Sequence, residues 1–202
     1  MSRRLTQRGE ARRQELLDFA TVRFAENGYH PTSVAEIVQG VGVGKGVFYW
    51  YFESKEQLLL EILKDAQLGL RRAQQQAIAD EGDPVRRIEL GIRASLAWSE
   101  AHRDVNNLIQ FASTDGRFTG ALERGQETAV ADVMRHLDDG ISRGEIRDVD
   151  PRMLAHAILG ATGQLARVFI HDQGVPASEV ADAVVAFVLD GLLVPDAAAL
   201  SR

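Results

Sequence analysis

The chain of 202 residues is long enough for one large domain, or for a small head attached to a larger body. It contains no cysteine, which excludes disulfides and thiolate chemistry, and its net charge of −6 argues against a uniformly basic nucleic-acid binder. The charge is unevenly distributed, because residues 1–55 carry eight Lys and Arg against six Asp and Glu, whereas residues 56–202 carry fifteen against twenty-three. Any contact with phosphate is therefore expected from the first 55 residues, since the acidic remainder would be repelled.

The first 55 residues predict three helices. A long helix is expected over 7–27, where apolar residues share one face and Gly28 follows as a C-terminal stop. Residues 33–36 fit a capping box that starts a short helix, and Gly42 ends this helix because glycine adopts a left-handed conformation at low cost. A third short helix is expected over 45–52.

The rest of the chain also predicts helices. Ser54 begins a second capping box, which opens a long helix over 55–79. Asp83 and Asp150 each precede a proline, as an N-cap precedes the first helical position. Further helices are expected over residues 84–102, 106–112, 120–142, 151–171 and 178–193. No segment alternates with period two between hairpin turns, so we predict an all-α fold of about nine helices.

Two short helices separated by a glycine-containing turn, after a longer supporting helix, match the helix-turn-helix pattern. The strings TSVAEIV (32–38), GVGKGVFYWYF (42–52) and SKEQLL (54–59) are more specific. Together they resemble the signature of the tetracycline-repressor (TetR) family of transcriptional regulators. The resemblance spans residues 9–59 and implies a helix-turn-helix DNA-binding domain over 1–54, with a helical effector-binding and dimerisation domain over 55–202. It further implies a homodimer whose two heads enter successive major grooves of operator DNA and whose body binds a small-molecule effector.

The residue chemistry of the first domain also favours DNA binding. Lysine and tyrosine side chains can donate to phosphate, small glycines permit close approach to the duplex, and Val47 and Trp50 offer apolar contact to a thymine methyl group. Phe48 and Phe52 share another face of their helix, which we assign to the core. The residues expected to contact DNA are Arg3, Arg4, Thr32, Ser33, Gly44, Lys45, Gly46, Val47, Tyr49, Trp50, Tyr51 and Lys55.

Two positions depart from the family pattern. Gly44 stands where a serine or threonine commonly caps the recognition helix, and Val47 stands where a hydroxyl residue is common. The alternative to a DNA-binding helix-turn-helix is an αα corner in an ordinary helical domain. The density of aromatic residues beside lysines argues against this alternative. For the arginines at the N-terminus, a solvated tail and an arm that reaches phosphates or the minor groove remain equal alternatives.

Motifs typical of enzymes are weak in this chain. The glycines at 40–46 lack the first glycine and the Ser/Thr of a phosphate-binding loop, and no strand precedes them. Ser142 lies in a G-x-S-x-G string, which however ends a predicted helix. The five histidines show no spacing typical of metal ligands. We therefore expect no enzyme, no metal and no cofactor; a hydrolase that uses Ser142, or a protein-interaction module, is the alternative to a regulator.

The second domain offers candidates for ligand binding and for dimerisation. The candidate effector residues, each of which can equally fill the core, are Trp98, His102, Phe111, Phe118, Gln164, Arg167 and Phe169. The candidate dimerisation residues, which suit either intrachain packing or a dimeric four-helix bundle, are Ile158, Ala161, Leu165, Val184, Val188 and Leu192. Because the most apolar stretch, 183–194, is interrupted by Asp190, we expect a soluble cytoplasmic protein.

Overall fold

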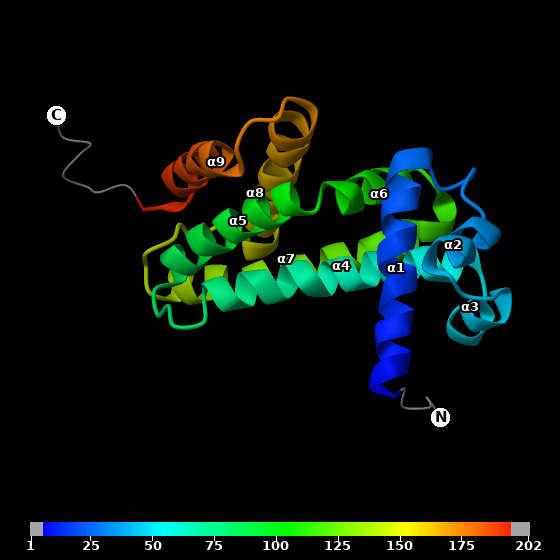
Figure 1. Ribbon diagram of the computed structural model, residues 1–202. Coiled ribbons are helices and arrows are strands. Elements are labelled where there is room, and N and C mark those ends of the chain that lie inside the picture. Colours follow the sequence, from blue (N-terminus) through cyan, green and yellow to red (C-terminus); the bar gives the residue numbers. More distant parts are fainter. Residues whose placement is uncertain (1–5, 195–202) are drawn as a thin grey trace. The chain divides into compact units, whose positions relative to one another are not determined.

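The computed structural model describes residues 6–194, and helices account for most of this part of the chain (Figure 1). Its elements are α1 (Gln7–Asn27), α2 (Val34–Val41), α3 (Lys45–Tyr51), α4 (Lys55–Ala77), α5 (Pro84–Ala101), α6 (Arg103–Ser113), α7 (Gly116–Ser142), α8 (Pro151–Leu165), the π-helical segment η1 (Ala166–Asp172) and α9 (Ala177–Leu192). Within residues 6–194 the β pairing is an isolated antiparallel bridge between Ile146 and Leu193. The all-α class predicted from the sequence is confirmed.

The described residues form two compact units. The first, which we call the head unit, comprises residues 6–67 and 104–123, and the second, the body unit, comprises residues 68–103 and 124–194. Helices α4 and α7 each contribute residues to both units. The functional boundary predicted between residues 54 and 55 stays a prediction.

The head unit is built on α1. Thr6 caps this helix by accepting a hydrogen bond from the Gly9 amide at 3.2 Å, and Gly28 follows it at φ 87°. The apolar face of α1 packs into a core with α2, α3, the first half of α4, and α6. This core is made of fully or almost fully buried side chains, among them Leu16, Leu17, Ala20, Phe24, Ile37, Phe48, Phe52, Leu58, Leu59, Leu63, Leu108 and Phe118.

A close approach between α1 and α2 explains one glycine. A Cβ atom at Gly40 would lie 1.9 Å from Cζ of Phe19, so only hydrogen fits there without movement of the ring. Arg23 of α1 reinforces the contact, because its Nε donates to the carboxylate of Glu36 in α2 at 2.9 Å. Helix α2 is thus held firmly against its support.

The body unit packs α5 against α9, α8 and η1. The predicted proline starts are confirmed: Asp83 accepts from the amides of Val85 and Arg86, and Asp150 accepts from the amide of Arg152 at 2.8 Å. The core contains the buried aliphatic side chains of Ile88, Ile92, Leu96, Val130, Leu137, Ile158, Val184, Val188 and Leu192.

Several helix boundaries differ from the predictions; helix α6, for example, begins at Arg103 instead of residue 106. Helix α7 begins at Gly116 instead of residue 120, because the Asp115 carboxylate accepts from the Arg117 amide at 3.1 Å and so starts the helix earlier. The single helix predicted over 151–171 changes at Ala166 into a π-helical segment, which is followed by Gly174 at φ 74°. A wider π-helical turn accommodates an extra residue, which periodicity does not reveal.

Candidate nucleic-acid interface and effector cavity

A helix-turn-helix is formed by α2, the segment 42–44 and α3. Ser33 caps α2 through its hydroxyl, which accepts from the Glu36 amide at 3.2 Å. Gly42 adopts the left-handed conformation at φ 72° and ψ 34°, and its amide donates back to Gln39. Gly44 precedes α3 without a side-chain cap. The predicted capping box and glycine turn are both present.

Helix α3 has a buried face and an outer face. Phe48 and Phe52 are 0% and 1% exposed, which confirms their assignment to the core. On the opposite side, Tyr49 and Trp50 are 56% and 58% exposed. Lys45 and Gly46 lie one turn earlier on the same side and are exposed as well, since positions i, i+1, i+4 and i+5 share a helical face. We call these four residues the outer face of α3.

The outer face combines one cation, two large aromatic rings and one position without a side chain. A Cβ atom at Gly44 or Gly46 would meet nothing within 4 Å, so neither glycine is required for packing within the chain. Both leave room for close approach by a partner. Val47 and Tyr51 are half-buried at the side of this face, and the rings of Trp50 and Tyr51 meet edge to face at 4.5 Å.

Two residues expected at phosphate are instead used inside the head unit. Thr32 is fully buried, and its hydroxyl donates to the Gly28 carbonyl at 2.9 Å. The ammonium of Lys55 donates to the carbonyls of Tyr29, His30 and Thr32 at 2.8, 3.2 and 2.9 Å. These bonds close the loop between α1 and α2.

Tyr29 is the centre of an aromatic and ionic cluster in the head unit. Its ring stacks on Phe111 at 5.1 Å and meets Phe118 edge to face at 5.6 Å, and the Lys55 ammonium lies 4.4 Å from the ring centre. Burial raises the pKa of the Tyr29 phenol to about 12. The hydroxyl is therefore neutral at physiological pH.

An arginine completes this cluster. Arg117 donates to Asp115 at 2.7 Å and to Glu56 at 3.1 Å, which joins the start of α7 to the start of α4. The hydrogen bonds from Arg117 lower the pKa of Asp115 to about 2. Sequence reasoning offered Phe111 and Phe118 as effector residues, but the structure places both in the aromatic cluster of the head unit.

The arginines near the N-terminus divide into two groups. Arg3 and Arg4 lie outside the described residues. Arg13 is drawn into the head unit, where it pairs with Glu61 at 2.6 Å and lies 5.5 Å from the Phe52 ring centre.

A cavity of about 130 Å3 lies in the body unit. Its wall comes from four helices and the turn after α4: Arg71, Gln74 and Gln75 of α4; Ile78 of the turn; Arg87, Ile88, Gly91, Ile92 and Ser95 of α5; Ala129, Asp132, Val133, Arg135 and His136 of α7; and Ile158, Leu159 and Thr162 of α8. Exposed residues such as Gln75 and Arg135 belong to this wall, which therefore reaches solvent.

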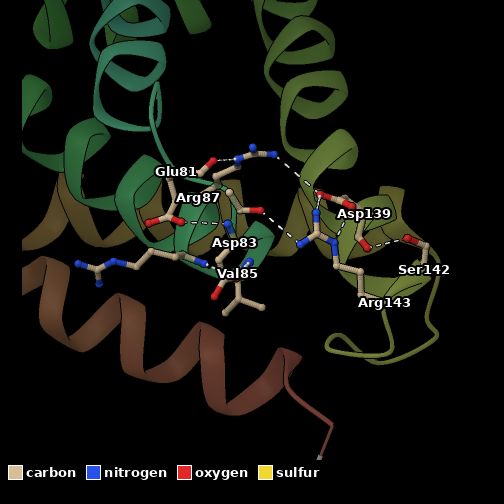
Figure 2. Close-up of polar contacts among 9 residues, drawn as sticks. Glu81, Asp83, Val85, Arg87, Asp139, Ser142 and Arg143 are labelled. Atoms are coloured by element: carbon tan, nitrogen blue, oxygen red, sulfur yellow. Dashed lines mark hydrogen bonds and ion pairs between the residues drawn. The ribbon is translucent and has the colours of Figure 1, made fainter.

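The charged groups along α7 are organised by two shared carboxylates. Asp132 pairs with Arg71 at 2.7 Å and with Arg135. About two turns further along α7, Asp139 pairs with Arg143 at 2.8 Å and with Arg87 at 3.8 Å. Figure 2 shows that Arg87 also donates to the backbone carbonyl of Glu81. Arg143 in turn donates to the Gly82 carbonyl at 3.3 Å.

The remaining effector candidates do not line this cavity. Trp98 stacks on His102 at 4.0 Å, and Arg167 pairs with Asp172 at 3.4 Å. Gln164 and Phe169 are exposed. The cavity residues were missed because their sequence signal, a polar stripe at 132, 135, 136 and 139, does not reveal which helix it faces.

The dimerisation candidates are used mainly within the chain. Ile158, Val184, Val188 and Leu192 are at most 6% exposed in the isolated protomer, and Leu165 packs against the same core. Ala161 is half-buried. Their neighbours on the same helices, Met153 of α8 and Phe187 of α9, are instead 65% and 70% exposed.

Within residues 6–194, the hydrolase motif has no strand beside it. Ser142 is exposed at the end of α7, and its hydroxyl donates to the Asp139 carbonyl at 2.7 Å (Figure 2). A serine in the last turn of a helix commonly makes such a hydrogen bond to a backbone carbonyl of the preceding turn. A nucleophile elbow would instead require a strained strand-to-helix turn.

A helix-turn-helix with an exposed basic and aromatic face, attached to a helical body, defines the class of DNA-binding transcriptional regulators. The family model described as "Bacterial regulatory proteins, tetR family" matches residues 16–62, and the model described as "Tetracyclin repressor-like, C-terminal domain" matches residues 81–192, more than half of the chain. The protein belongs to the TetR family of bacterial regulators, which confirms the resemblance seen in the sequence.

Individual relatives agree with this membership. The HTH-type transcriptional repressor KstR2 of Mycobacterium tuberculosis is 28% identical over 189 residues, which cover 90% of this chain and 93% of that protein. The regulator AcrR of Shigella flexneri is 32% identical over 114 residues, 54% of this chain and 53% of its own. A TetR-family structure from Syntrophomonas wolfei superposes with a TM-score of 0.81 at 24% identity and covers 93% of this chain and 99% of that one. The structure of the ketosteroid regulator KstR2 of M. tuberculosis gives a TM-score of 0.70 at 26% identity, covering 95% and 97%.

Proposed function

We propose that this protein is a cytoplasmic, homodimeric repressor that holds an operator through the outer face of α3 and releases it when a small molecule occupies the cavity of the body unit. The observation that carries the proposal is the outer face itself. The side chains of Tyr49 and Trp50 are more than half exposed and lie beside Gly46 and Lys45. The opposite face of the same helix is buried. Such exposure is costly for a protein without a partner at that surface.

The chain offers a route from the cavity to the head unit. Helices α4 and α7 line the cavity and also contribute residues to the head unit. A ligand that binds one packing of these helices better than another would shift the population of the two. In a dimer, that shift changes the spacing of the two recognition helices relative to successive major grooves.

A second copy of the chain is the proposed partner for α8 and α9. An 18-residue window within Pro151–Asp172 has a mean hydropathy of 1.3, yet only 28% of this window is buried within the protomer. Met153 and Phe187 are the most exposed large apolar side chains described on these two helices. Pairing this surface with its copy would form the four-helix arrangement common to dimeric helical proteins.

Selection of bound sequences from random DNA tests the central claim. On the selected operator, Lys45→Ala is expected to weaken binding by about 1 to 3 kcal/mol if the lysine reads a base. Lys64→Ala is the matched control, because Lys64 is also an exposed lysine, at 63%, but lies on α4. Failure to select any sequence, or equal affinity of the wild type and Lys45→Ala, would contradict the assignment of this face.

Light scattering of the purified protein tests the dimer. Phe187→Glu is expected to yield monomers, because a charge on each copy would be buried at the proposed interface without a partner. Val22→Glu is the control, since Val22 is 42% exposed on α1, away from the proposed interface residues in sequence and element. A dimer that persists in Phe187→Glu would refute this surface.

The alternatives from the sequence are tested in the same preparation. Hydrolysis that disappears in Ser142→Ala would favour an enzyme, and a stable protein complex with no DNA affinity would favour an interaction module. The helix-internal hydrogen bond of Ser142 argues for a structural role of its hydroxyl.

A further inference from the structure

The two sides of the body cavity differ in chemistry. Helices α5 and α8 supply Ile88, Ile92 and Ile158, each of which is 4% exposed, and together they make an apolar floor. Helices α4 and α7, together with Arg87 of α5, supply the charged and amide side chains, including arginines that reach solvent. A molecule that fits both sides has one apolar end and one polar end.

The charge at the polar side is positive. Three arginines, Arg71, Arg87 and Arg135, line the cavity together with a single carboxylate, Asp132. Asp139 is not among the lining residues, and its carboxylate is shared by Arg87 and Arg143. The guanidinium groups therefore outnumber the carboxylates, which leaves an excess of positive charge at the opening.

The carboxylate in the wall is already occupied. One oxygen of Asp132 accepts from Nη2 of Arg71 at 3.0 Å and also meets Arg135, and the other oxygen lies 2.7 Å from Nε of Arg71. A cationic ligand would have to displace an arginine to reach it. Arg71 and Arg135 share the single carboxylate of Asp132, so an anionic ligand would give these guanidinium groups a second acceptor. Arginine binds carboxylates favourably in bidentate geometry.

We propose that the effector is a small amphipathic organic anion, with a carboxylate or similar group among the arginines of α4, α5 and α7 and an apolar ring or short chain against α5 and α8. This inference rests on the proposed function for the identity of the cavity as the effector site, and it adds the charge, polarity and size of the ligand. Burial, and to a lesser extent Arg87 and Arg135, lower the pKa of the His136 imidazole against the opposing effect of Asp132 and Asp139, so the cationic groups of the wall at neutral pH are its arginines.

The size of the cavity limits the apolar part. A dry apolar cavity of about 150 Å3 holds one benzene molecule. The cavity here measures about 130 Å3, so its enclosed part accommodates one ring or a chain of comparable volume. The charged group would then lie at the opening, where Arg135 is 64% exposed.

Gly91 provides a way to fill the cavity without distorting its wall. This residue lies within α5 and lines the cavity, and a Cβ atom placed on it would meet nothing within 4 Å. Gly91→Leu therefore directs a side chain into open space, and Gly91→Ala adds one methyl group as the matched control. Both remove a glycine from a helix interior, which favours folding.

The test uses three probes of nearly identical shape and different charge: benzoate, benzamide and benzamidine. Isothermal titration of the full-length protein is expected to give a Kd for benzoate at least about tenfold below those of benzamide and benzamidine. Gly91→Leu is expected to raise the Kd of benzoate at least about tenfold relative to Gly91→Ala. Thermal unfolding of both variants confirms that the change acts on the cavity and not on the fold.

Three results would overturn the inference: binding of benzamide or benzamidine as tight as that of benzoate, an unchanged Kd for benzoate in Gly91→Leu, or no binding of any probe up to about 10 mM, the weakest range expected of a fragment. Operator binding is measured separately on selected DNA. If benzoate binds with the expected selectivity but the protein selects no DNA, the ligand class stands and the proposed function fails. If the operator is held and released only by neutral or cationic compounds, the function stands and the ligand class fails.

Discussion

Replacing Lys55 by methionine separates a structural lysine from a DNA contact. The Lys55 ammonium donates to three backbone carbonyls at 2.8, 3.2 and 2.9 Å and lies over the Tyr29 ring at 4.4 Å. Hydrogen bonds from a charged donor contribute about 1.5 to 3 kcal/mol each, but exposed acceptors regain water when the donor is lost. Because His30 is exposed and Tyr29 is buried, we expect Lys55→Met to lower the free energy of unfolding by about 2 to 4 kcal/mol.

The assay pairs urea unfolding with operator binding at several salt concentrations. Each phosphate contact adds about 0.9 to the slope of log K against log salt concentration. Lys55→Met should leave this slope unchanged in the folded protein while it shifts the unfolding midpoint. Lys45→Met is the matched variant, because Lys45 is exposed on α3, and its stability should stay within about 0.5 kcal/mol of the wild type.

The opposite pattern would refute this assignment. If Lys55→Met reduces the salt slope by about 0.9 and leaves the urea midpoint where it was, the ammonium contacts phosphate and the carbonyl contacts are incidental. The sequence prediction of Lys55 as a DNA-binding residue would then hold.

Further predictions concern acid stability, packing and helix glycines. The pKa of Asp115 falls from 3.8 to about 2 in the folded protein, so its contribution to stability is present above pH 3.8 and is lost as the pH falls toward 2. In Asp115→Asn, the melting temperature should therefore depend less on pH between 2 and 3.8 than in the wild type. Phe118→Ala removes a ring that is 0% exposed and should lower the urea-derived stability by about 3 to 5 kcal/mol; a loss below about 1 kcal/mol would contradict its place in the core. Gly40→Ala should lower the melting temperature because its Cβ would meet Phe19 at 1.9 Å, whereas Gly91→Ala should raise it, and equal shifts would contradict the packing described.

Local sequence signals determined most of the secondary structure and the recognition module. The capping residues Ser33 and Asp83 and the left-handed Gly42 act on their own neighbours in the chain, so the helices they bound could be predicted without tertiary information. The burial of Phe48 and the exposure of Trp50 follow from helical periodicity once α3 is placed against its support. The family signature lies in this same segment, which is why the class of protein was already evident from the sequence.

Tertiary structure decided which polar and aromatic residues meet. Lys55 lies 23 to 26 residues along the chain from the carbonyls that it binds. Phe118 of α7 packs on Tyr29, although the two residues are far apart in the sequence. The cavity depends on four helices whose mutual rotation no local pattern specifies, so Arg71, Arg87 and Asp132 could not be grouped in advance. Local signals act through backbone hydrogen bonds within a few residues, whereas a binding site is defined by contacts between side chains that only the packing of distant helices brings together.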